Sequence, residues 1–193
     1  MKKYFLLIFT FLLVLWGCNK QDGILEPSQN SKFTETVKMD NSQNLQLISL
    51  PVNLKKSHGS LASLLTVERI SGNSGGEIEA EYSEKNFEIK AHLKIPAGAF
   101  SGTKNLSMEL SNISTEITFG PSMVFTNALS LDLEYSGLNL KGINPNSVRF
   151  VYLSPSGQYE FVQYDKLEVN TKDGILKVEG AVIPHFSRFG FCR

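Results

Sequence analysis

The residues with the clearest potential for chemistry are His185-Phe186-Ser187, close to the C-terminus. A serine hydroxyl can attack the carbonyl of the preceding residue when that peptide is strained, and a histidine two positions upstream can accept the proton. Water would then open the ester and leave the chain cleaved between Phe186 and Ser187. Residues two apart on a strand share one face, which would bring His185 and Ser187 together.

The alternative is that this triplet belongs to the last core strand, with His185 hydrogen-bonded and Phe186 buried. The sequence favours this alternative, because backbone strain has to be observed and does not follow from a motif. We therefore expect a protein that is not an enzyme, with His185 and Ser187 retained as a candidate catalytic pair for self-cleavage.

The other residues capable of chemistry do not form a recognisable metal motif. His58, His92 and His185 are not spaced as zinc ligands, and neither Cys18 nor Cys192 has a second cysteine nearby. Each histidine is expected to have a structural or surface role, and Cys192 to be an unpaired thiol. We predict no metal ion and no cofactor.

Five glutamates alternate with apolar or other residues between positions 77 and 88. They are Glu77, Glu79, Glu81, Glu84 and Glu88. A calcium loop needs oxygens that converge around a tight turn, so this alternation fits a solvated strand face better. A glycosidase pair made of Glu79 and Glu81 rests on very weak evidence, because every surface sheet offers such carboxylate pairs.

A cluster of aromatic residues near the C-terminus suggests a platform for sugars. It consists of Tyr152, Tyr159, Phe161 and Tyr164. Packing in the core or between neighbouring strands is the more frequent use of such residues. The cluster supports a carbohydrate-binding accessory module as a further hypothesis.

The N-terminus has the features of a secretory signal. Lys2 and Lys3 precede an uncharged run over 4–15 that is shorter than the roughly 20 residues a spanning helix needs. Leu15-Trp16-Gly17-Cys18 closes the run and resembles the lipobox of bacterial lipoproteins. This resemblance implies a signal peptide over 1–17 and a diacylated Cys18 that anchors the chain in a membrane. The alternative is an ordinary signal peptide in which Cys18 occurs by chance.

A polar segment separates this anchor from the folded part. Residues 18–44 are rich in Gln, Asn, Ser, Lys and Asp, and such a segment buries too little apolar surface to fold, so we predict a flexible tether. Residues 45–74 are predicted to hold short edge strands and a loop, with strands at 45–54 and 65–70. Residues 75–193 are predicted to form the main domain.

The main domain is predicted to consist of successive short strands. Apolar residues alternate over 87–95 and again over 129–135, and Asp173-Gly174 is a strong hairpin signal. A brief helical turn is expected at 143–148, and a last strand over 181–191. The pattern predicts an all-β, antiparallel, immunoglobulin-like sandwich of eight or nine strands.

Several short segments in this order resemble the ZU-five domain of zonula occludens proteins, netrin receptors and ankyrins, and its bacterial lipoprotein relatives. They are Gly75-Gly76, Ile95-Pro96-Ala97-Gly98-Ala99, Phe119-Gly120-Pro121, the strand over 129–135, and Pro184 to Phe189. The resemblance covers roughly 75–191 and implies a sandwich used as an interaction module. In some relatives of this domain, a His-Phe-Ser triplet cleaves its own backbone. The resemblance therefore makes His185 and Ser187 candidates for the same reaction.

The net charge and the residue after Cys18 indicate which partners and which membrane to expect. The 19 basic and 19 acidic residues cancel, so no basic surface argues for nucleic acid. Asn19, directly after the lipidated cysteine, favours the outer membrane over retention in the inner one, by resemblance to Gram-negative lipoproteins. We expect a lipid-anchored envelope protein that binds a protein or glycan ligand.

Overall fold

The computed structural model describes residues 45–51 and 64–193 and confirms the all-β antiparallel sandwich. These residues form eleven strands in two sheets, and every strand pair is antiparallel. The predicted signal peptide, Cys18, the tether and His58 lie outside the described residues.

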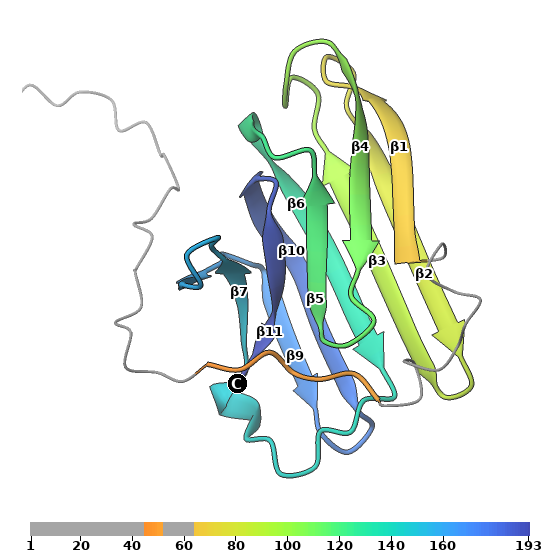
Figure 1. Cartoon of the computed structure of the whole chain (residues 1–193), viewed down its shortest axis with the longest axis vertical. Coiled ribbons are helices and arrows are strands. Elements are labelled where there is room, and N and C mark those ends of the chain that lie inside the picture. The colour runs from red at the N-terminus through yellow and green to blue at the C-terminus, as the bar shows by residue number, and fades with distance from the viewer. Residues whose placement is uncertain (1–44, 52–63) are drawn as a thin grey trace, which may run out of the picture. The chain divides into compact units, whose positions relative to one another are not determined.

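Figure 1 shows the two sheets as two layers, with β4 and β5 in front of β3 and β6. The six-stranded sheet has the order β1 (Leu65–Ser71), β4 (Thr103–Leu110), β5 (Glu116–Gly120), β11 (Arg188–Cys192), β7 (Arg149–Leu153) and β8 (Tyr159–Phe161). The five-stranded sheet has the order β2 (Gly76–Glu84), β3 (Phe87–Ile95), β6 (Val124–Ser136), β10 (Ile175–His185) and β9 (Lys166–Asn170).

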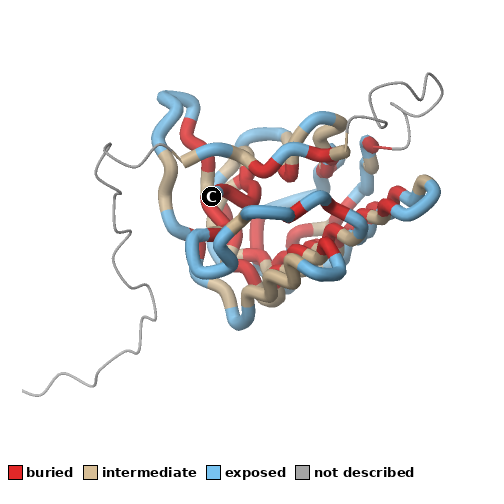
Figure 2. The backbone as a smooth tube through the Cα atoms, turned by 90° about the horizontal axis from the view of Figure 1, so that it is seen from below, coloured by how far each residue is buried: buried red, intermediate tan, exposed pale blue. Residues whose placement is uncertain are grey.

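Alternation of buried and solvent-facing residues along β2, β3 and β6 places one face of the five-stranded sheet in the core. In β3 every second residue from Phe87 to Ile95 is buried, which is the period of a strand with one face against another layer. Figure 2 shows the buried positions lying between the layers and the exposed ones concentrated at the loops and outer faces. The sandwich is thus held together by apolar burial between the sheets.

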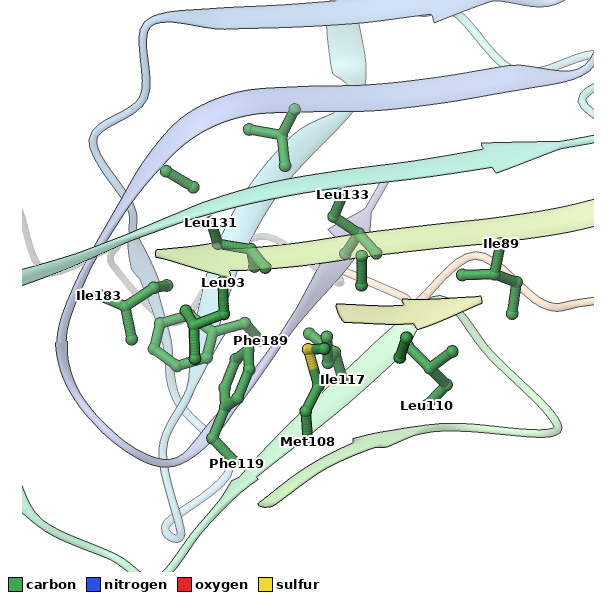
Figure 3. Close-up of a cluster of buried hydrophobic side chains, with 14 of the residues drawn as sticks. Ile89, Leu93, Met108, Leu110, Ile117, Phe119, Leu131, Leu133, Ile183 and Phe189 are labelled. Carbon is green, nitrogen blue, oxygen red and sulfur yellow. The ribbon is translucent and has the colours of Figure 1, made fainter. Parts of the chain in front are cut away.

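The centre of the core is built by side chains from both sheets (Figure 3). The five-stranded sheet contributes Ile89, Leu93, Leu131, Leu133 and Ile183, and the six-stranded sheet contributes Met108, Leu110, Ile117, Phe119 and Phe189. All ten are at most 3% exposed, so the two layers exclude water from the space between them.

Residues 45–51 run alongside the end of β11 without forming a regular strand. Gln46 and Arg193 exchange two backbone hydrogen bonds of 3.0 Å each, and Leu47 and Ser49 form isolated bridges with Cys192 and Ser114. Ile48 is buried, and its carbonyl accepts a hydrogen bond from the Thr115 amide, so the segment lies beside the residues that lead into β5. The predicted strand at 65–70 is confirmed as β1.

The structure has eleven strands where the sequence predicted eight or nine, and the chain changes sheets near its C-terminus. The single strand predicted over 181–191 is wrong: β10 ends at His185 in the five-stranded sheet, and β11 begins at Arg188 in the six-stranded sheet. The apolar pattern continues through the bend because Phe186 is itself a core residue. The predicted helical turn is confirmed as a 3-10 helix, η3 (Pro145–Ser147).

Replacing Tyr135 with phenylalanine should raise the free energy of unfolding by about 1 kcal/mol. The Tyr135 hydroxyl is fully buried and has no hydrogen-bond partner among the residues that the structure describes; burial, with the charge of Glu116, raises its pKa. Removing it leaves the ring contact with Phe191 in place. Urea unfolding of the two proteins measures the difference.

Tyr82→Phe is the matched control, since the Tyr82 hydroxyl donates a 2.6 Å hydrogen bond to Glu84. That substitution should not stabilise the protein. A Tyr135→Phe protein less stable than the wild type would mean that the hydroxyl is satisfied in solution.

Candidate functional site

The His185-Phe186-Ser187 triplet lies where the chain crosses from one sheet to the other. His185 is the last residue of β10, while Phe186 and Ser187 form the bend before β11. The expectation that His185 and Ser187 share one face of a strand is therefore wrong. Alternation of side chains holds only within a continuous strand.

The contacts of the triplet anchor it to both neighbouring segments. The Phe186 ring is 1% exposed and packs at 5.2 Å against Phe119 and edge-on at 4.8 Å against Phe125. The Phe186 amide donates to the carbonyl of Met123, and the Phe119 amide donates to the carbonyl of Ser187, both at 2.8 Å. The bend is thus fixed by core packing and by backbone hydrogen bonds.

The side chains of His185 and Ser187 are not joined by any hydrogen bond in the described part of the chain. The His185 ring instead meets the Tyr152 ring edge-on at 4.7 Å and lies 6.2 Å from the Phe189 ring. Lys85 is the only nonglycine residue with a positive φ among residues 45–51 and 64–193. The arrangement therefore supports a packing role for His185.

Intact mass spectrometry should give an unshortened protein for the wild type and for Ser187→Ala, starting at Asn19 in both cases. The reason is that the His185 ring packs against Tyr152 and makes no hydrogen bond to the Ser187 hydroxyl, as a general base must. A wild-type mass that lacks residues 187–193, restored by the substitution, would establish self-cleavage instead.

The second candidate is the solvent-facing side of the five-stranded sheet, which we call the outer charged face. It carries eight carboxylates, four lysines and one histidine. These are Glu77, Glu79, Glu81, Glu88, Lys90, His92, Lys94, Asp132, Glu134, Lys166, Glu168, Lys177 and Glu179. Alternation forces these residues outward because their neighbours in sequence fill the core.

Strand register arranges the charges of this face in rows across the sheet. Glu81, Lys90, Glu134 and Lys177 are consecutive cross-strand neighbours on β2, β3, β6 and β10. Directly opposite residues on one face are close enough to interact, so signs alternate along this row with favourable energy.

The neighbouring row consists of Glu79, His92 and Asp132. Asp132 is held firmly: Lys94 donates to one of its carboxylate oxygens and the amide of Gly180 to the other, each at 2.8 Å. Partial burial raises the pKa of Asp132, but these two hydrogen bonds, together with the nearby positive charge of Lys94, leave the pKa below its usual value. Asp132 is therefore a fixed negative charge beside His92.

A shallow depression of about 250 Å³ lies over these two rows. Its floor includes Ala91 and Leu133, whose neighbours in sequence supply the charged walls. The lysines at its rim are already paired, Lys90 with Glu88 at 3.0 Å and Lys177 with Glu179 at 2.9 Å. Hydrogen bonds to these carboxylates raise the pKa of both lysines, which keeps them charged.

Folding brings His92 together with Glu77 and Glu79. One ligand-capable atom from each of these three side chains lies within 4.8 Å of the other two. Neither the spacing of the glutamates nor that of the histidines in the sequence predicted this cluster. A hairpin that turns at Lys85 and Asn86 pairs Glu79 with His92. Assigning this turn from the sequence would have predicted the cluster.

The aromatic cluster does not form a single exposed row. Tyr152 packs on the main core beside His185, whereas Tyr159 packs against the smaller cluster that contains Cys192. Phe161 is 39% exposed, and Tyr164 is partly buried against the core. These four rings therefore do not offer a flat platform to a sugar.

Cys192 is free and fully buried. Burial and the nearby charge of Glu116 raise the pKa of its thiol to about 12, so the thiol is protonated at neutral pH. It behaves as a small apolar core residue.

Comparison with known proteins found no match: no family model fits the chain, and no curated protein or solved structure is significantly similar to it. The resemblance to the ZU-five domain stays a prediction. Among residues 45–51 and 64–193, no helix has the length and apolar character needed to cross a membrane.

Proposed function

We propose that this protein is a lipid-anchored component of the bacterial cell envelope whose β-sandwich is a non-enzymatic binding module. The outer charged face is its binding surface, and its ligand is a protein segment with a basic character. The observation that carries this proposal is the depression over the ordered rows of charge on β2, β3, β6 and β10.

The charge balance of the face supports a basic ligand. Its carboxylates outnumber its lysines two to one, although the whole chain is neutral. Complementary charge speeds encounter and selects partners. Because the rows lie on paired strands and not on loops, the face is preorganised, which reduces the entropy that binding has to overcome.

The location in the envelope rests on the N-terminal sequence. A charged start, an apolar run and the lipobox-like Leu15-Trp16-Gly17-Cys18 support lipidation at Cys18, and Asn19 supports the outer membrane. The ZU-five resemblance supports an interaction module in the same way. A tether over 18–44 would let the sandwich reach a partner away from the membrane.

Site-specific photo-crosslinking in living cells tests the binding surface. A photoreactive phenylalanine analogue replaces either Glu81 on the outer charged face or Glu109, which is exposed on β4 of the other sheet. We expect one discrete crosslinked product from position 81 and none from position 109. The product should disappear when Glu134→Lys reverses a charge in the same row.

Equal crosslinking from both positions, or none from position 81, would show that the outer charged face is not the binding surface. A product that survives Glu134→Lys would show that charge does not select the ligand.

A further inference from the structure

We propose that Glu77, Glu79 and His92 form a binding site for one divalent transition-metal ion, and that Zn²⁺ fits the site best. The three side chains lie together on the outer charged face, with one potential ligand atom from each within 4.8 Å of the other two. This inference stands on the geometry of the cluster and does not depend on the proposed function.

The backbone sets the positions of all three residues. Glu79 and His92 are directly opposite each other in the β2–β3 pairing, and Glu77 is two residues along β2 on the same face. Nine consecutive residue pairs, from Gly76 with Ile95 to Glu84 with Phe87, fix this register. A site built on paired strands is held more precisely than one on a loop.

The imidazole faces both carboxylates with one nitrogen. His92 Nε2 is hydrogen-bonded to a carboxylate oxygen of Glu77 and lies 3.9 Å from Oε1 of Glu79. The two lysines that flank His92 on β3 have other partners: Lys94 donates to Asp132, and Lys90 is paired with Glu88. A cation would therefore enter between three ligand atoms without displacing a lysine from them.

Asp132 lies on the other side of His92, directly opposite it in the β3–β6 pairing. A histidine that ligates a metal commonly has a carboxylate beside its ring, which raises the basicity of the ligand. The row Glu79-His92-Asp132 places a carboxylate on each side of the ring. Asp132 keeps its own hydrogen bonds to Lys94 and Gly180, so it contributes a fixed negative charge beside the His92 ring.

The ligand types select the metal. One imidazole nitrogen with two carboxylates suits Zn²⁺, which takes three protein ligands and leaves further positions to water or to a bound group. Calcium needs six to eight oxygen ligands, which this cluster does not supply. The Glu77 and Glu79 side chains are 63% and 72% exposed, so they can rotate to close the remaining distance.

The open side of such an ion would face solvent next to the depression. Glu79 and His92 belong both to the metal cluster and to the wall of that depression. An ion held there would add a positive charge at its rim.

Isothermal titration calorimetry of the full-length protein tests the site. The protein carries no histidine tag, is treated with a chelator and then dialysed, and is titrated with ZnCl₂ and, separately, with CaCl₂. We expect one saturable Zn²⁺ site and no comparable heat from Ca²⁺. His92→Gln and Glu79→Gln should each weaken Zn²⁺ binding by at least about tenfold, since even outer-shell changes cost roughly 10–100-fold.

Glu88→Gln is the matched control, because Glu88 lies on the same face of β3 but outside the cluster. It should bind Zn²⁺ as the wild type does. Thermal unfolding of each variant verifies that the fold is kept. The absence of a saturable Zn²⁺ site, unchanged affinity in His92→Gln, or an equal loss in Glu88→Gln would overturn the proposal.

Discussion

Replacing Phe186 with alanine should lower the free energy of unfolding by about 3–5 kcal/mol, the cost of removing a buried phenylalanine. Phe186 is 1% exposed and contacts the rings of Phe119 and Phe125 at the point where the chain changes sheets. The bend is held on both sides by backbone hydrogen bonds, so the cavity cannot collapse easily. The loss should therefore lie at the high end of this range.

Urea unfolding followed by far-UV circular dichroism measures this effect, because the single tryptophan, Trp16, lies in the predicted signal peptide. Phe161→Ala is the matched control: Phe161 is 39% exposed on the short strand β8 and should cost much less. Similar losses in the two variants would show that Phe186 is not part of the core in solution.

Replacing Cys18 with alanine should abolish lipidation completely. In the lipidation that we propose, the Cys18 sulfur of the lipobox-like sequence is the acylation site, and two or three acyl chains are needed for a stable anchor. Cells grown with radiolabelled palmitate should label the wild-type protein and leave the Cys18→Ala protein unlabelled. The variant should also keep residues 1–17 and migrate as a larger chain on a gel.

Cys192→Ala is the control for this experiment, since Cys192 is buried within the sandwich and is not a lipidation candidate. It should take up label as the wild type does. A Cys18→Ala protein that still incorporates palmitate would mean that the N-terminal segment is an ordinary signal peptide with a chance cysteine.

The strands were largely predictable because their signal is local. Apolar residues at every second position over 87–95 and 129–135 coincide with β3 and with the C-terminal half of β6, where the same positions are buried. The 3-10 helix was predictable from the Pro-Asn-Ser sequence at 145–147 for the same reason. These residues express preferences that depend only on near neighbours.

The crossover at Phe186 was not predictable from that pattern. An apolar residue at this position fits a continuing strand as well as a bend that points into the core. The choice depends on which sheet offers hydrogen bonds, and Phe119 and Met123, far away in sequence, supply them. Whether the side chains of His185 and Ser187 lie on one face of a strand therefore depended on tertiary structure.

The arrangement of the outer charged face depends both on the local sequence pattern and on the pairing of strands. The sequence by itself determined that Glu77, Glu79 and Glu81 point to solvent, because alternation along one strand fixes the side on which each residue lies. Only the tertiary structure placed His92 opposite Glu79 and Asp132 opposite His92. Strand pairing decides which charges meet, and a register shift by one residue would turn each of these side chains to the other face.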